Sequence, residues 1–178
     1  MMSDLKNCCT SSRCYESGAD MSQPIFSIRP ATDEDISEIV KIENAVHLAP
    51  WTAEHVKAEL EKPYSHVWIM TDDETDSKLA GYIVFWLFMG ECQILNVAVD
   101  LPYRGLGYAK HMIRQAANLT AREGIQKITL EVRKSNQAAI ALYQGMNFVI
   151  TQIRKSFYSN GEDAYFMTLS LKDDELRF

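Results

Sequence analysis

The segment spanning residues 94–113 constrains the fold of this chain more than any other. An apolar run typical of a strand, 94–99, ends at Asp100-Leu101-Pro102, and a turn with two glycines, 104–109, follows. A helical pattern comes next, with an expected buried stripe at Ala109, Met112, Ile113, Ala116 and Leu119. The first N–H groups of a helix have no partner inside it, the helix dipole adds positive potential there, and glycine lets the backbone approach a ligand closely. The segment therefore predicts a strand–turn–helix unit that binds a pyrophosphate group.

The whole chain predicts one mixed α/β domain over residues 24–172, with a disordered N-terminal extension over 1–23 and a short tail over 173–178. Capping residues Thr32, Thr52 and Asn136, and the apolar pattern after the glycine turn, predict four helices. In the first helix, Glu43 is a polar break in an apolar stripe. Alternating or apolar runs predict strands over residues 25–29, 67–70, 79–88, 94–99, 127–132, 148–153 and 164–171. The predicted element order is β-α-α-β-β-β-α-β-α-β-β.

Composition and charge exclude several classes of function. The net charge of −6 argues against a nucleic-acid-binding surface as the main function, because such a surface needs a basic footprint. No apolar run is long enough to span a membrane, and residues 1–20 lack the apolar core of a secretory signal. Three of the four cysteines lie near the N-terminus, so no disulfide framework runs through the body of the chain, and the cytoplasm is the expected location.

The cysteines and histidines predict no metal site. Cys8, Cys9 and Cys14 form no Cys-x-x-Cys pair and have no histidine nearby. The four histidines are scattered along the chain without the spacing of metal ligands.

Three ligand-binding motifs place a glycine turn before a helix. A dinucleotide-binding fold requires Gly-x-Gly-x-x-Gly directly after its first strand, whereas Gly105 and Gly107 follow several strands. A P-loop requires Gly-Lys-Ser/Thr, which Lys110-His111 does not match. The third motif, Arg/Gln-x-x-Gly-x-Gly/Ala, matches residues 104–109 in full. A tight turn with no ligand is the remaining alternative.

This third motif is the acyl-CoA signature of the Gcn5-related N-acetyltransferases (GNAT), a family that the chain resembles over residues 25–171. Residues 96–99 resemble the central strand of the family, whose backbone pairs with the pantetheine arm. The rest of the resemblance rests on residues 130–133, 135–136, 141–143 and 147–148. Asn147 departs from it, because the family usually has glycine there, but asparagine tolerates the left-handed backbone. The resemblance implies the GNAT fold, with a mixed, mostly antiparallel central sheet flanked by helices, and acetyl-CoA as cosubstrate.

The resemblance also assigns site residues. Glu131 falls on the general base and Tyr143 on the general acid, although strand alternation alone would turn Glu131 to solvent and Tyr143 alone would be a core residue. An amide of residue 97 or 99 is expected to polarise the thioester carbonyl. Arg104 is either a charge partner of the phosphates or a solvated side chain, and Asn136 is a CoA contact, a helix cap, or both. The expected CoA-binding residues are Val97, Ala98, Val99, Arg104, Gly105, Leu106, Gly107, Tyr108, Ala109, Lys110 and Asn136.

Within the family, the chain is most similar to the RimI-type subgroup, which acetylates the N-terminal alanine of a small-subunit ribosomal protein. This similarity rests on Pro50-Trp51-Thr52, on residues 130–133 and on the segment 158–167. The expected activity is acetyl transfer to a protein N-terminal α-amino group by direct attack in a ternary complex. The alternatives are a lysine side chain or small amine as acceptor, and a CoA-binding regulatory module without catalysis. Retention of both Glu131 and Tyr143 argues against the regulatory module.

A candidate peptide groove and the role of Cys92 have two interpretations each. By resemblance, Trp51, Tyr158 and the loop 159–163 are candidate walls of a peptide groove, with ordinary loop packing as the alternative. Cys92 has no neighbouring histidine in the sequence to activate it, so a packed thiol is favoured over a covalent acetyl-enzyme.

Overall fold

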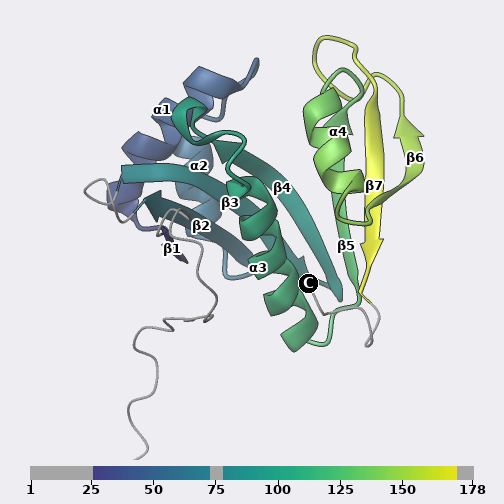
Figure 1. Cartoon of the computed structure of the whole chain (residues 1–178), viewed down its shortest axis with the longest axis horizontal. Coiled ribbons are helices and arrows are strands. Elements are labelled where there is room, and N and C mark those ends of the chain that lie inside the picture. The colour runs from purple at the N-terminus through teal and green to yellow at the C-terminus, as the bar shows by residue number, and fades with distance from the viewer. Residues whose placement is uncertain (1–25, 73–77, 172–178) are drawn as a thin grey trace, which may run out of the picture.

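The computed structural model describes residues 26–72 and 78–171, which form a seven-stranded sheet flanked by helices (Figure 1). The strands are β1 (Phe26–Pro30), β2 (Ser65–Asp72), β3 (Lys78–Phe88), β4 (Glu91–Val99), β5 (Lys127–Arg133), β6 (Val149–Arg154) and β7 (Ala164–Ser170). The helices are α1 (Ile36–Val46), α2 (Ala53–Leu60), α3 (Tyr108–Arg122) and α4 (Gln137–Gln144), with the 3₁₀ turns η1 (Asp33–Asp35) and η2 (Leu101–Tyr103). The predicted element order is confirmed, with the two 3₁₀ turns added. The predicted extension and tail lie outside the described residues, so the domain bounds stay predictions.

The sheet has the strand order β1-β2-β3-β4-β5-β7-β6. Among the strand pairs of the described chain, β4 and β5 run parallel and the other neighbours are antiparallel. This arrangement confirms the expected mixed, mostly antiparallel sheet. The central strand β3 reads as a nearly continuous apolar run because both of its faces are covered.

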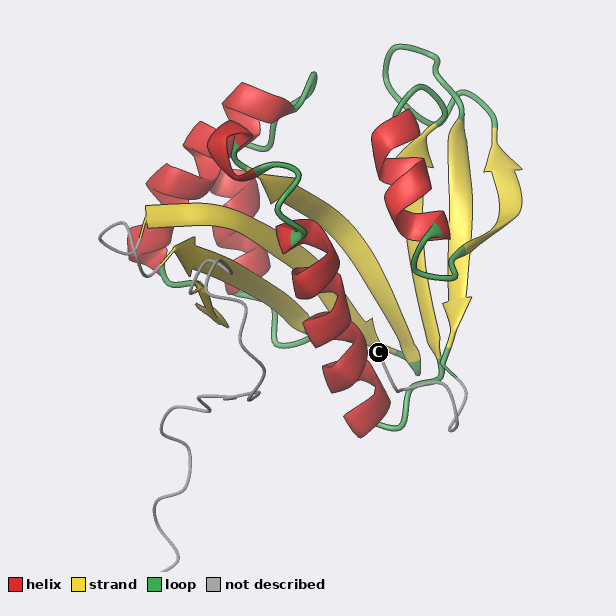
Figure 2. Ribbon diagram, in the orientation of Figure 1, coloured by secondary structure: helices red, strands yellow, loops and turns green. Residues whose placement is uncertain are grey.

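Helices cover both faces of the sheet, as Figure 2 shows. Successive residues of β3 belong to two different clusters of buried side chains, which places the clusters on opposite faces. Ile83 and Phe85 pack with α3, whose Met112 and Ile113 are fully buried. Tyr82 and Val84 pack with α1 and α2 on the other face. Burying an isoleucine or methionine side chain contributes about 1.5–3 kcal/mol, so α3 is held firmly against the sheet.

The helix α1 differs from its predicted pattern at Glu43. This residue was expected to interrupt an apolar stripe, but the structure leaves it only 1% exposed, within the contact between α1 and the sheet. A buried carboxylate needs hydrogen-bonding partners. Those partners come from outside α1, which periodicity along one helix does not reveal.

The strands β4 and β5 pair over a short distance and then diverge (Figure 1). In the described chain, Cys92–Ile94 pairs with Ile128–Leu130, and the later residues of β4 have no partner on β5. On its other side β4 stays paired with β3, with a register shift: Ile94 lies opposite Phe85, and Asn96 lies opposite Val84. Leu95 is therefore the extra residue of a β-bulge, which bends a strand and increases its twist. The bulge marks the point where β4 leaves β5.

Candidate active site

The glycine turn joins β4 to α3 in the conformation that a phosphate-binding loop requires. Gly105 and Gly107 have φ angles of 80° and 83°, in the left-handed region that favours glycine, and Gly107 is the N-cap of α3. A Cβ atom at either position would meet nothing within 4 Å, so backbone conformation requires glycine here and the space in front of the turn is open. The hydrogen bonds within α3 begin at His111, whose N–H donates to the Gly107 carbonyl over 3.0 Å. The N–H groups before His111 therefore have no acceptor inside the helix.

The side chains of this turn divide into exposed and buried ones. Arg104 and Leu106 are exposed, and the Arg104 Nε donates to the Val99 carbonyl over 3.3 Å, which links the turn to the end of β4. Tyr108 is 2% exposed, with its ring 5.3 Å from that of Phe26. Tyr108 can therefore serve a ligand only through its backbone, which is the contribution expected from this turn.

The end of β4 has one paired edge and one edge that β5 leaves open. Val97, Ala98 and Val99 lie opposite Ile83, Tyr82 and Gly81 of β3. The Ala98 side chain is buried in the cluster of α1 and α2, while Val97 and Val99 pack toward the α3 side. The expected CoA-binding segment thus adjoins the glycine turn, and no β5 residue of the described chain pairs with it.

Glu131 lies on β5, where β5 and β4 separate. Its side chain is only 11% exposed. Strand alternation by itself predicts a solvent-facing side chain here, and that prediction is wrong. The Arg154 Nη1 of β6 donates to its Oε1 over 2.7 Å, and the Gln93 Nε2 of β4 donates to its Oε2 over 3.3 Å. The Arg154 guanidinium also lies 4.5 Å from the centre of the Phe166 ring. Glu131 is therefore a mostly buried, paired carboxylate, and its Oε2 has the longer hydrogen bond of its two oxygens.

Tyr143 lies on α4 and is 9% exposed. Burial raises the pKa of Tyr143 to about 12, with a smaller contribution from Tyr158. Burial also raises the pKa of Tyr158, where Arg133 acts in the opposite direction and the Glu131 charge acts in the same direction. Tyr158 thus interacts electrostatically with both Tyr143 and Glu131, and the fold brings these three residues into one region.

The loop that carries Tyr158 is fastened to the segment between β5 and α4. Hydrogen bonds from Ser135, together with the ion pair to Arg133, lower the pKa of Glu162 to about 2. The Arg133 Nη1 lies 3.0 Å from the Glu162 Oε2, and its guanidinium lies 3.6 Å from the centre of the Tyr158 ring. Asn136 caps α4, because its Oδ1 accepts from the Ala139 N–H over 3.1 Å. The cap is confirmed, and a CoA contact of Asn136 stays a prediction.

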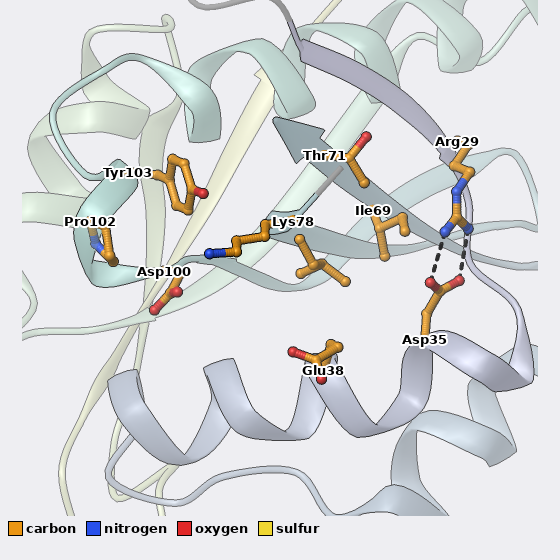
Figure 3. Close-up of a pocket in the computed structure, with 10 residues that line it drawn as sticks. Arg29, Asp35, Glu38, Ile69, Thr71, Lys78, Asp100, Pro102 and Tyr103 are labelled. Atoms are coloured by element: carbon orange, nitrogen blue, oxygen red, sulfur yellow. Dashed lines mark hydrogen bonds and ion pairs between the residues drawn. The ribbon is translucent and has the colours of Figure 1, made fainter. Parts of the chain in front are cut away.

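A cavity of about 530 Å³ lies elsewhere, between β1, α1 and η2 (Figure 3). The Arg29–Asp35 ion pair, with two nitrogen–oxygen distances of 2.7 and 2.8 Å, lies on one side of it. Lys78 and Asp100 lie toward its other end. Neither Glu131 nor Tyr143 lines this cavity, so it is distinct from the predicted catalytic region.

Known proteins resemble this chain in sequence and in fold. The model of the Acetyltransferase (GNAT) family matches residues 36–148. A Bacillus subtilis (strain 168) protein assigned as a ribosomal protein bS18-alanine N-acetyltransferase is 35% identical, over 83% of this chain and 97% of the relative. The protein of the same name from Escherichia coli (strain K12) is 27% identical, over 77% of this chain and 92% of the relative.

The chain belongs to the acetyltransferase (GNAT) family. Its fold resembles the crystal structure of the ribosomal-protein-S18-alanine N-acetyltransferase from Escherichia coli, with a TM-score of 0.75 and 26% identity, over 86% of this chain and 100% of that chain. Ard1 from Thermoplasma volcanium gives a TM-score of 0.76 at 26% identity, over 83% of this chain and 99% of that chain. These matches identify an N-acetyltransferase with the GNAT fold.

Two expectations about single residues of this acetyltransferase are confirmed. Cys92 is fully buried and is a free thiol, and burial raises its pKa to about 11, so it is packed rather than activated. Asn147 has a φ of 66°, the left-handed conformation in which glycine is usual.

Within residues 26–72 and 78–171, no helix is long and apolar enough to cross a membrane. The same residues contain no group of three or more histidine, cysteine or acidic side chains that could hold a metal ion.

Sequence patterns did not indicate that Arg154 and Gln93 are partners of Glu131. Arg154 is 23 positions away from Glu131, at the end of an edge strand whose other residues are exposed. Gln93 lies opposite Thr129, so it becomes a diagonal neighbour of Glu131 only when the parallel register of β4 and β5 is known. No local pattern could have found either residue.

Proposed function

We propose that this acetyltransferase transfers the acetyl group of acetyl-CoA to a protein N-terminal α-amino group, and that its acceptor is the N-terminal alanine of ribosomal protein bS18. One observation supports the reaction: β4 and β5 pair only as far as Ile94 and Leu130, so residues 97–99, which lead into the glycine turn, and Glu131, which follows Leu130, lie on two diverging strands. The names of the relatives at 35% and 27% identity support the choice of acceptor.

The acceptor amine must lose a proton before it attacks. An α-ammonium group has a pKa of about 8, against about 10.4 for lysine, so an α-amine needs only modest help from a base. Glu131 supplies that base, directly or through water. Because Arg154 engages Oε1 at 2.7 Å and Gln93 engages Oε2 at 3.3 Å, we assign proton acceptance to Oε2.

Acetyl-CoA supplies an acyl group activated as a thioester, and three groups of this chain act on it. The N–H groups at the start of α3 and the glycine turn bind the pyrophosphate. A backbone N–H of Val97 or Val99, on the strand edge away from β3, stabilises the developing oxyanion. Tyr143 donates its hydroxyl proton to the departing thiolate, since a pKa of about 12 keeps that hydroxyl protonated throughout the neutral range.

A competition assay tests the acceptor. Acetyl-CoA is supplied with peptides that begin with alanine, with peptides that begin with other residues, and with a peptide that is blocked at its N-terminus but contains lysine. The alanine peptide is expected to be acetylated fastest, at its α-amine, as located by mass spectrometry. Acetylation of the blocked lysine peptide alone would contradict the proposal and favour a side-chain acceptor.

The variants E131Q and Y143F test the catalytic roles. General acid or base catalysis contributes roughly 10²- to 10⁴-fold, so each variant is expected to lower kcat by about that factor. Unchanged rates in both variants would refute the assigned roles. Binding of acetyl-CoA by the wild type, without transfer to any peptide, would favour a regulatory module.

A further inference from the structure

Glu43 is a buried carboxylate that the proposed mechanism does not use. It lies in the last turn of α1 and is 1% exposed. Its Oε2 accepts from the Trp51 backbone N–H over 2.8 Å, and its Oε1 accepts from the Asn96 Nδ2 over 2.5 Å. The His47 Nε2 lies 3.7 Å from Oε1. One carboxylate therefore joins α1, the segment that connects α1 to α2, and β4.

The β-bulge places Asn96 where Glu43 can reach it. Leu95 packs in the cluster of α1 and α2, Val97 packs toward α3, and Ala98 returns to the cluster of α1 and α2. Strand alternation from Val97 and Ala98 turns Asn96 to the α1 face as well, so the extra residue of the bulge leaves two neighbours on one face. Asn96 directly precedes the strand edge assigned to the thioester. The position of Glu43 is thus set by the strand that forms the predicted acyl-transfer site.

The other end of this contact lies in the segment between α1 and α2. Leu48, Ala49 and Pro50 of this segment are exposed, Leu48 by 87%. Among the backbone N–H groups of 48–51, the described structure records a hydrogen bond for that of Trp51, to Glu43. Glu43 therefore ties the Trp51 backbone to β4, while the N–H of Thr52, the next residue, donates to the His55 side chain of α2.

Glu59, a second buried glutamate, differs from Glu43 in how its charge is balanced. Glu59 of α2 is 7% exposed and receives hydrogen bonds from Lys62, Ser65 and Trp86, with the Lys62 Nζ at 2.6 Å. Its charge is balanced by a lysine, and its partners join α2 to β2 and β3. Among the ion pairs of the described residues, Glu43 has no lysine or arginine partner. Its ion-pair partner there is His47, at 3.7 Å. Since an incompletely balanced buried charge lowers stability, a structural role alone gives a poor account of Glu43.

We propose that Glu43 is a positioning residue that sets acceptor selectivity, by holding Trp51 at a fixed distance from the acyl-transfer strand. This inference rests on the proposed function, because it takes the space beside Trp51 as the place of the first acceptor residue. With Trp51 held at a fixed distance from β4, the space between them accommodates a small side chain, such as that of alanine, on the first residue of the acceptor. A large side chain there is disfavoured. Loss of the contact lets the segment move and relaxes that preference.

The variant E43Q tests the proposal with little change of shape. Glutamine has one acceptor oxygen, so it cannot accept from both Trp51 and Asn96, and its amide nitrogen must face one of these donors. A hydrogen bond to a charged group contributes enough free energy for a change on the order of tenfold when it is lost. We expect the KM for the alanine peptide to rise about tenfold and the preference for alanine over leucine as first residue to fall, with the KM for acetyl-CoA unchanged.

E59Q is the matched control, because it makes the same substitution at the other buried glutamate of this layer. It is expected to lower thermal stability while keeping the wild-type preference for alanine. The double variant E43Q/N96D exchanges donor and acceptor in the hydrogen bond between positions 43 and 96. The glutamine oxygen can then accept from the Trp51 N–H, and its amide nitrogen can donate to the carboxylate introduced at position 96. Recovery of the alanine preference in this variant is expected, and a purely structural role does not predict it.

Several outcomes overturn the proposal. These are a wild-type KM and preference in E43Q, an equal loss of preference in E43Q and E59Q, and a folded double variant without recovery. If E43Q does not fold, the double variant decides alone. If the wild type modifies only the lysine peptide, the proposed function falls, and the KM for that peptide in E43Q and E59Q still decides whether Glu43 positions the acceptor.

Discussion

A substitution at Gly81 tests whether the end of β4 holds acetyl-CoA. Gly81 lies on β3, opposite Val99. A Cβ atom at this position would lie 2.6 Å from the Ala98 carbonyl oxygen and 3.3 Å from the Val99 Cα. Real Cβ contacts essentially never fall below 3.0 Å, so in G81A the two strands must separate by at least 0.4 Å at Ala98. The Ala98 oxygen is backbone and cannot rotate away as a flexible side chain would.

The expected cost follows from this overlap. Forcing an extra carbon into a packed site costs about 1–3 kcal/mol, which urea unfolding of G81A should detect. If the displacement of Ala98 and Val99 weakens ligand binding by the middle of that range, the KM for acetyl-CoA rises on the order of tenfold, since about 1.4 kcal/mol corresponds to tenfold. Initial rates at saturating peptide measure that constant.

G90A is the control, because it strains the turn that joins the same two strands at their other end. Gly90 lies in the β3–β4 turn with a φ of 78°, and a Cβ atom there meets nothing within 4 Å. Left-handed backbone costs a residue with a side chain about 1–2 kcal/mol, so G90A should lose comparable stability with an unchanged KM for acetyl-CoA. A G81A protein that is destabilised but keeps the wild-type KM would refute our assignment of the strand edge.

Two further predictions concern the catalytic side chains. R154M should lower kcat on the order of tenfold, because Glu131 loses a charged hydrogen bond that orients it; R154K should recover part of the rate, and wild-type kcat in R154M would contradict the orienting role. Tyr143 has a pKa raised to about 12 from 10.0, so the folded chain keeps its proton where the unfolded chain loses it, and stability falls as pH rises from 10 to 12. Urea midpoints of the wild type should therefore fall more steeply across this interval than those of Y143F, and parallel curves would show that Tyr143 does not titrate as a buried group.

Features that depend on adjacent residues could be predicted closely from the sequence. The glycines of the turn, the cap at Asn136 and the left-handed Asn147 are satisfied within a few positions of the chain, so residue type and spacing sufficed. The buried face of α3 was correct at Met112, Ile113 and Ala116, because helical periodicity fixes which side chains point the same way. Ala109 and Leu119 were expected to be buried and are half-buried, while Thr120 is fully buried. Periodicity does not fix the rotation of a helix against its sheet so finely.

By itself, the sequence determined the strand–turn–helix unit, its family and the residue types available for acetyl transfer. The tertiary structure decided what surrounds them. Glu131 meets Arg154 across 23 positions, and Glu43 meets Asn96 across 53, through strand pairings and a bulge that no local pattern encodes. The reason is physical: turns and caps form between neighbouring backbone groups, whereas the pairing of a buried carboxylate depends on which distant segments the packed sheet and helices bring within hydrogen-bonding distance.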